Sequence, residues 1–236
     1  MSATLTPLRR ERARALLVER LARLEPQPVE VSDSRVVTAI TRAAWAQAVL
    51  RAAASASNLS LAHTRLAVLG AGPLARELAT RTAAMGARVL VVGDDPVALV
   101  ELAQLGLAVA VIDGARLDDV VLAFATGELD RPVDAGALGR GGPVLVVDAA
   151  EDANAVSVET DSSSGRPGIA RILGTDREAF VLVAREAADG STRRTREQLS
   201  SAFSAALSEA RAADPGADGA DLAARADRAL ALEVLA

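Results

Sequence analysis

The stretch Arg65–Ala79, RLAVLGAGPLARELA, decides the fold class. It opens with a short apolar run, LAVL, that ends at a glycine, which is typical of a buried strand in a parallel sheet. Gly70, Gly72 and Ala75 then follow the G-x-G-x-x-A spacing, and a helix is expected from Pro73 onward. In such a turn the first glycine permits a tight bend, the second lets a pyrophosphate approach the backbone, and the small third residue lets helix and strand pack closely. We therefore predict a Rossmann-like fold.

The residues on both sides of this turn continue an alternation of apolar strands and helices. This alternation is typical of βαβ units, and it predicts an α/β protein with a doubly wound parallel sheet covered on both faces. The expected strands are 66–69, 88–92, 108–112, 120–124, 144–147 and 180–183, the expected helices are 36–57, 73–85, 96–105 and 221–235, and 159–168 is expected to be a surface loop.

Three segments are expected along the chain. Residues 1–58 would form a helical segment that packs on the core, 59–190 a Rossmann-like NAD-binding domain, and 191–236 a C-terminal helical extension. The part beyond Gly190 is rich in Arg and Ala, and Asp214-Pro215-Gly216 is expected to interrupt its helices.

The composition excludes several classes of chemistry. All 26 basic residues are Arg, Cys is absent, and His63 is the only histidine. Without Cys there is no thiol nucleophile and no thiolate metal site, and one His cannot form a multi-His site. Without Lys there is no Schiff base and no Walker lysine. We therefore expect no metal site and no catalytic residues, and because His63 precedes the first strand we expect it to lie at the surface.

Charge and hydropathy favour a cytoplasmic protein that binds neither nucleic acid nor membrane. The net charge is −5, whereas nucleic-acid binders normally carry a basic field. No run of about 18 uncharged apolar residues is present. Residues 6–24 alternate Arg with Leu and contain two Glu, which predicts an amphipathic helix and not a secretory signal. Such a helix would pack on the domain or on a second copy of the chain, and a membrane-surface helix is the alternative.

The end of the second strand, VLVVGDDP, carries the candidate ribose ligand. Roughly 20 residues after the glycines, a carboxylate should accept hydrogen bonds from the ribose. That position is Gly93, and Asp94 lies one residue further, where the side chain of an extended chain points the other way. A turn could still bring Asp94 and Asp95 to the ribose; capping of the next helix is the alternative for Asp94. No Arg lies between Arg88 and Arg116, which favours NAD over NADP.

Five strings occur in one order along the chain: LEPQPVEVSDS (24–34), WAQAVLRAAASASNLSLAHTRLAVLGAG (45–72), MGARVLVVGDDPVALVELAQLGLAVAVID (85–113), ATGELD (125–130) and GGPVLVVDAAED (141–152). In this order they resemble the cofactor-binding domain of S-adenosyl-L-homocysteine hydrolase, over about two-thirds of the chain. The resemblance implies NAD as the cofactor and a subunit interface on this domain, and hence a homo-oligomer.

The same resemblance implies further cofactor-binding positions. Thr126 and Gly127 correspond to the family's Thr-Gly-Asn turn, and Asp148 to an Asn at the end of a later strand. Arg76, on the first helix after the glycines, would approach phosphate or face solvent. The predicted cofactor site comprises Gly70, Gly72, Pro73, Leu74, Ala75, Asp94, Asp95, Thr126, Gly127 and Asp148.

The sequence departs from the family where the family carries its chemistry. The Lys-Phe-Asp-Asn segment is missing from 35–44 (RVVTAITRAA), Glu128 replaces the turn's Asn, Asp148 the later Asn and Glu151 a His. The 236 residues also lack counterparts of the family's C-terminal Lys and Tyr and of its large substrate domain. An ionised carboxylate only accepts hydrogen bonds, whereas an amide also donates them, so we expect an altered redox geometry.

Three hypotheses on function remain. The first is a stand-alone adenosylhomocysteinase-like NAD-binding-domain protein that lacks hydrolase activity and acts by nucleotide binding, assembly or regulation. The second is a subunit of a split enzyme whose substrate domain is another polypeptide. The third is a free-standing NAD-dependent oxidoreductase with Asp148, Glu128 and Glu151 as candidate acid/base residues. The expected partners are a nucleotide or adenosine-like molecule, a second copy of the chain, and, for some of these roles, another protein.

Overall fold

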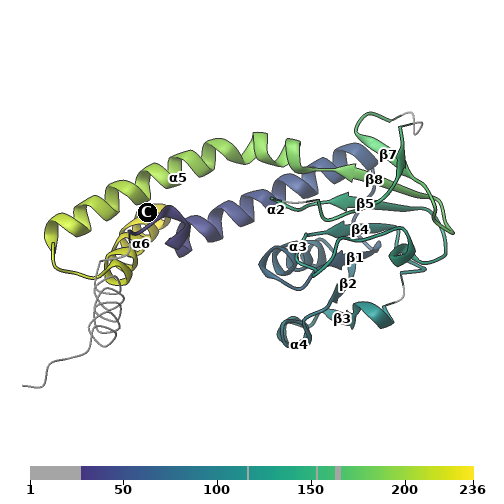
Figure 1. Cartoon of the computed structure of the whole chain (residues 1–236), viewed down its shortest axis with the longest axis horizontal. Helices are drawn as coiled ribbons and strands as arrows, with labels where there is room; N and C mark the ends of the chain where they lie inside the picture. Colours follow the sequence, from purple (N-terminus) through teal and green to yellow (C-terminus); the bar gives the residue numbers. More distant parts are fainter. Residues whose placement is uncertain (1–27, 116, 153, 163–165) are drawn as a thin grey trace, which may run out of the picture. The chain divides into compact units, whose positions relative to one another are not determined.

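The computed structural model of the protein describes residues 28–236 except 116, 153 and 163–165 (Figure 1). The described residues divide into two compact units, 39–196 and 28–38 together with 197–236. These divisions fall inside the helices α2 (Arg35–Ser57) and α5 (Arg185–Ala213), whereas the sequence predicted boundaries after residues 58 and 190. The helix predicted for 6–24 lies outside the described residues.

The larger unit is built on an eight-stranded sheet with the order β3-β2-β1-β4-β5-β8-β7-β6. The pairs from β3 to β8 are parallel, while β7 and β6 add to the edge in antiparallel orientation. The strands are β1 (Arg65–Leu69), β2 (Arg88–Gly93), β3 (Ala108–Val111), β4 (Leu122–Ala125), β5 (Val144–Asp148), β6 (Thr160–Asp161), β7 (Ile169–Ile172) and β8 (Ala179–Val183).

The antiparallel edge was not predicted from the sequence. The segment 159–168, predicted as a loop, contains the two-residue strand β6, and β7 follows it. A two-residue strand of Thr and Asp carries no hydrophobic period, so composition alone assigns it to a loop.

The two faces of the sheet are covered differently. Successive strand residues point to opposite faces. Leu66 and Val68 of β1 belong to a core cluster with α3 (Pro73–Ala84), α4 (Pro96–Gln104) and the part of α2 around Trp45. Ala67 and Leu69 belong to a second cluster, formed with irregular segments between residues 112 and 158. Both faces are covered, as predicted, but the crossover from β4 to β5 contains only the 3₁₀ turn Gly136–Leu138 in place of an α-helix.

Trp45 ties α2 to the carboxyl edge of the sheet. Its side chain is 1% exposed, and its indole N–H donates to the Ala149 carbonyl, just after β5, at 2.8 Å. A buried tryptophan needs such an acceptor, because an unpaired N–H in the core is costly. The helix is therefore held in register against the strand ends that form the candidate site.

The smaller unit has a core of its own, made of Val37, Phe203, Ala226 and Leu230. It contains α6 (Gly219–Leu235), whose N-cap Asp218 accepts a hydrogen bond from the Asp221 N–H at 2.7 Å. The predicted interruption at 214–216 lies between α5 and α6. In the part of the chain that the structure describes, no helix is both long and apolar enough to cross a membrane.

Candidate functional site

The glycine turn lies at the carboxyl end of β1, next to the point where the strand order reverses between β1 and β4. Open α/β sheets bind their ligands in this crevice. Gly70 has φ +136, and a Cβ at this position would lie 2.0 Å from the Thr126 Oγ1 atom. Gly72 is the N-cap of α3, and Pro73 occupies its first turn. The predicted turn is therefore present, at the predicted edge of the sheet.

The N-terminus of α3 is occupied by a side chain of the protein itself. Glu128 Oε1 accepts a hydrogen bond from the Leu74 N–H at 2.7 Å, and Glu128 Oε2 accepts one from the Ala75 N–H at 2.9 Å. Free N–H groups of this kind, at the positive end of a helix, are what a bound phosphate would use. A carboxylate of the chain thus lies where the sequence predicts a phosphate of the cofactor.

The second glycine makes room for this carboxylate. A Cβ at Gly72 would lie 2.5 Å from Glu128 Oε1 and 2.6 Å from Glu128 Cδ. Gly72 also has no side chain with which to cap α3, so Glu128 supplies the cap from another loop. A carboxylate cap and its interaction with the helix dipole typically contribute about 1 kcal/mol.

The end of β2 has no space for a side chain at Gly93, the position where the glycine fingerprint normally has a ribose-binding acid. A Cβ at Gly93 would lie 2.7 Å from the Ala71 Cβ, because β2 packs closely against the glycine turn. Asp94 accepts a hydrogen bond from the Asp130 N–H at 2.6 Å. Asp95 is the N-cap of α4 and accepts from the Val97 N–H at 2.8 Å. The capping role that was the alternative for Asp94 therefore belongs to Asp95, and Asp94 holds the loop after β4.

We call the segment Thr126–Asp130 the Glu128 loop. At its start the Thr126 N–H donates to the Leu69 carbonyl of β1 at 3.0 Å. At its end Asp130 is bound to Asp94, just beyond β2. Gly127 has φ +76 and leaves no space for a side chain, since a Cβ would lie 2.8 Å from that of Ala150. The loop thus runs across the carboxyl ends of β1 and β2, and the predicted Thr126 and Gly127 are parts of it.

Asp148, at the end of β5, is only 3% exposed. Its carboxylate accepts hydrogen bonds from the Ala155 N–H at 3.2 Å and from the Ala150 N–H at 3.3 Å. Burial raises the pKa of Asp148, while these hydrogen bonds and the positive charge of Arg185 oppose the rise. Asp148 therefore holds the loop that follows its own strand.

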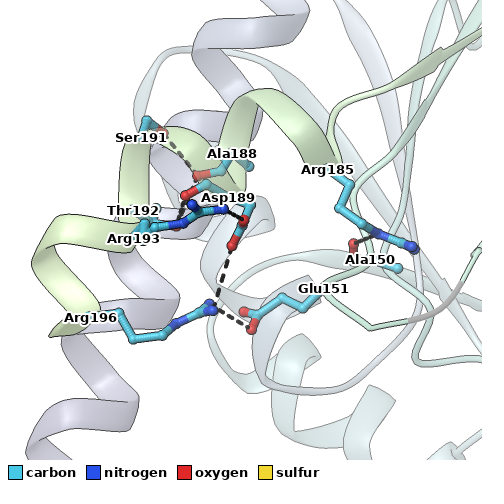
Figure 2. A network of polar contacts seen from close by, with 9 residues as sticks. All are labelled: Ala150, Glu151, Arg185, Ala188, Asp189, Ser191, Thr192, Arg193 and Arg196. Carbon is cyan, nitrogen blue, oxygen red and sulfur yellow. Dashed lines mark hydrogen bonds and ion pairs between the residues drawn. The ribbon is translucent and has the colours of Figure 1, made fainter. Parts of the chain in front are cut away.

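Glu151 lies in a polar network with the first turns of α5 (Figure 2). Arg196 forms ion pairs with Glu151 and with Asp189, each at 3.7 Å. The network is completed by Arg193, paired with Asp189 at 3.0 Å, and Arg185, which donates to the Ala150 carbonyl at 3.3 Å.

Burial raises the pKa of the Glu151 carboxyl group. The positive charges of Arg196 and Arg42 oppose this rise, and the negative charges of Asp152 and Glu128 add to it.

Two other residues that the sequence analysis discussed, Arg76 and His63, lie at the surface. Arg76 is exposed on α3 and lines a cavity of about 720 Å³ beside Gly72. His63 is exposed in the turn before β1, at the end of the strand opposite the glycines, and its backbone N–H donates to the Gly86 carbonyl at 2.9 Å. The surface position predicted for His63 is confirmed.

Sequence reasoning missed Arg177, which organises the loops on the second face. The side chain is 6% exposed and donates to backbone carbonyls only, and its burial lowers its pKa. Nothing in the local sequence distinguishes it from the chain's other arginines, because its acceptors come from distant segments. These acceptors are the carbonyls of Gly142 at 2.6 Å, Leu117 and Val120 at 2.8 Å, and Leu138 at 3.2 Å.

A cavity of about 600 Å³ lies on the loop-covered face of the sheet. Its wall includes Leu69 and Val92, at the carboxyl ends of β1 and β2, and Asp113, just after β3. Within the described residues, no three His, Asp or Glu side chains are grouped as in a metal site.

Solved structures with a similar arrangement are known. The A chain of dipicolinate synthase from Bacillus subtilis matches at 18% identity, over 76% of this chain and 57% of its own, with a TM-score of 0.56. The chain has a Rossmann-like fold. The corresponding dipicolinate synthase protein from Bacillus halodurans matches at 22% identity, over 51% and 42%, with a TM-score of 0.45. Transhydrogenase from Sinorhizobium meliloti matches at 18% identity, over 75% and 58%, with a TM-score of 0.47.

These likenesses concern the fold, and this chain spans between 42% and 58% of the length of the three structures. No family model matches the sequence, and no curated protein matches it. The predicted fold class is confirmed. The closer resemblance to S-adenosyl-L-homocysteine hydrolase stays a prediction.

Proposed function

We propose that the protein is a non-catalytic Rossmann-like domain of the NAD-binding type, which acts through nucleotide binding, assembly or regulation. The observation that carries this proposal is the pair of hydrogen bonds from the Leu74 and Ala75 N–H groups to Glu128. An enzyme that turns over with a dinucleotide needs these N–H groups for the pyrophosphate. Here the protein satisfies them itself, so a dinucleotide reaches the turn only by displacing Glu128, which favours a regulatory role over turnover.

The other acids of the site support the same proposal. Asp94, Asp95 and Asp148 each accept hydrogen bonds from backbone N–H groups of the chain. A general acid or base must lie within hydrogen-bond reach of the atom that it protonates or deprotonates. Side chains that hold loops and cap helices are poorly placed for that work.

The proposed ligand class is NAD or an adenosine-like molecule. The cavity of about 600 Å³ beside Leu69 and Val92 has the volume of typical small-molecule sites. The Asp113 carboxylate on its wall offers an acceptor for a ribose hydroxyl. We also propose that the protein is a cytoplasmic homo-oligomer. In the split-enzyme alternative, a different polypeptide would supply the substrate domain.

One observation favours an oxidoreductase as the second candidate. Burial raises the pKa of Glu151, and acids with raised pKa values near a ligand crevice are candidates for proton transfer. In this case Glu151 would act as the acid or base, and a nicotinamide cofactor would supply the hydride chemistry.

The experiment is an activity assay on the purified chain with NAD and S-adenosylhomocysteine, together with calorimetry using NAD, NADP and adenosine. The proposal predicts no turnover and binding of NAD or adenosine in the millimolar range or tighter. Turnover of S-adenosylhomocysteine would overturn the non-catalytic role, and its loss in Glu151→Gln would show that Glu151 takes part in the chemistry.

A further inference from the structure

We infer that the Glu128 loop is an autoinhibitory segment, in which the Glu128 carboxylate closes the phosphate position of the glycine turn until a dinucleotide displaces it. This inference rests on the proposed function, because it assumes that the turn has kept an affinity for phosphate.

The first step of the argument is direct competition. The two carboxylate oxygens take the N–H groups of Leu74 and Ala75, and a phosphate at this turn would need the same donors. The negative charge of Glu128 would also repel a pyrophosphate at short range. Both groups cannot occupy the turn together, so a ligand binds only to molecules from which the carboxylate has moved away.

The second step is that the carboxylate can leave without disrupting the sheet. Glu128 is partly exposed, and its side chain belongs to a loop and not to a strand. The Thr126 hydroxyl lies 2.9 Å from Glu128 Oε2 and 3.0 Å from the Leu69 carbonyl oxygen. When Glu128 moves away, this hydroxyl still has Leu69 as an acceptor, and the Leu74 and Ala75 N–H groups lose their acceptor until the incoming phosphate takes its place.

The third step concerns the surroundings of the turn. The cavity of about 720 Å³ beside Gly72 is lined by Arg42 and Arg76, among others. Gly72 lines the same cavity, so these positive charges lie beside the turn, where they would attract an anion or the displaced carboxylate. Glu77 and Glu101 line the same cavity, so the charge of its wall is mixed and the arginines alone do not make it an anion-binding site.

The competing explanation is a permanent helix cap. A cap of this kind contributes stability and never leaves, and its removal would then weaken the fold without creating affinity for a nucleotide. The two explanations differ in what happens to ligand binding when the carboxylate is removed.

The test is calorimetry with NAD and with inorganic pyrophosphate on the full chain, as wild type, Glu128→Ala and Glu128→Gln. Glu101→Ala is the matched control, because it deletes the same charge from an exposed residue that lines the cavity beside Gly72 and does not cap α3. Glu128→Ala should bind NAD at least about tenfold more tightly than wild type, since it removes the competitor. Glu101→Ala should bind as wild type does.

Glu128→Gln keeps an oxygen for the two N–H groups and loses the charge, so it should fold even if Glu128→Ala does not. We expect it to gain part of the affinity. A measurable wild-type affinity for NAD that stays within twofold in the variants would overturn the inference and leave the proposed function standing, whereas no binding by any of them would overturn both the inference and the proposed NAD binding. Turnover is a separate readout: if it appears in any form of the chain it contradicts the non-catalytic proposal, whether or not the affinity rises.

Discussion

The Glu128 Oε1 atom lies 2.7 Å from the Leu74 nitrogen, so a side chain from the loop after β4 caps the helix that follows β1. This relationship connects two segments that are 54 residues apart. It also shows that the glycine motif can bind a group of the protein itself. The turn has the shape that a dinucleotide needs, and in the structure that shape accommodates a carboxylate of the protein.

Replacing Glu128 with Ala should lower the free energy of unfolding by about 1–2 kcal/mol, because the helix loses a capping group and a favourable charge at its N-terminus. Urea denaturation at neutral pH measures the change. Glu101→Ala should stay within about 0.5 kcal/mol of wild type. Equal losses in both variants would mean that the loss of charge, and not the cap, is responsible.

Placing an acid where the glycine fingerprint normally has one, as Gly93→Asp, should destabilise the protein by about 1–3 kcal/mol through overpacking against Ala71. The matched control is Gly114→Asp, where a Cβ would meet nothing within 4 Å. Adding Ala71→Gly to Gly93→Asp should recover part of the loss in a thermal melt. A Gly93→Asp protein as stable as Gly114→Asp would contradict the close packing of β2 on the glycine turn.

Substituting Arg177 with Lys should cost about 2–4 kcal/mol, because an ammonium group cannot reach four carbonyls from distant segments. Arg140→Lys provides the control, since this side chain forms an exposed ion pair with Asp176. It should change the free energy of unfolding by less than about 1 kcal/mol. Similar values for the two variants would show that the buried guanidinium does not hold the loops.

The pH dependence of stability should reflect Asp148. Because burial raises its pKa in the folded protein above the ordinary 3.8, the folded state binds more protons than the unfolded state between the two pKa values. Its contribution to stability is therefore complete below the unfolded pKa and is lost as the pH rises through the folded pKa. Asp148→Asn lacks this titration, so its free energy of unfolding should rise relative to wild type as the pH increases above the ordinary pKa of 3.8, and should level off above the folded pKa. Parallel pH profiles of the two proteins would contradict this.

Most of the central sheet could be predicted from the sequence, because parallel strands buried on both faces are short apolar runs. The strand predicted at 144–147 is β5, and the helix predicted at 73–85 is α3 with a difference of one residue. The edge strand β6 could not be predicted, since Thr160 and Asp161 are both exposed and polar. Its pairing depends on β7 and not on a local pattern.

The position of the candidate site could be predicted from the sequence, but the side chain that binds there could not. The glycine spacing places the turn at the carboxyl edge of the sheet, and a Rossmann-like fold requires that position. That Glu128 would reach Ala75, and that Asp94 would bind Asp130, depends on how the loop after β4 is folded back over β1 and β2. Spacing along the chain does not contain this information. The resemblance to S-adenosyl-L-homocysteine hydrolase predicts that Glu128 stands where that family has an amide, and this prediction is the signal from which the self-capped turn could have been suspected.

The most direct measurement follows the backbone amides of Leu74 and Ala75 by NMR during titration with NAD. If Glu128 holds these two N–H groups, their signals should stay in place in the wild-type protein at NAD concentrations that saturate the Glu128→Ala variant, where both should shift. Wild-type signals of Leu74 and Ala75 that shift at the same NAD concentrations as those of the variant would contradict a carboxylate-closed turn.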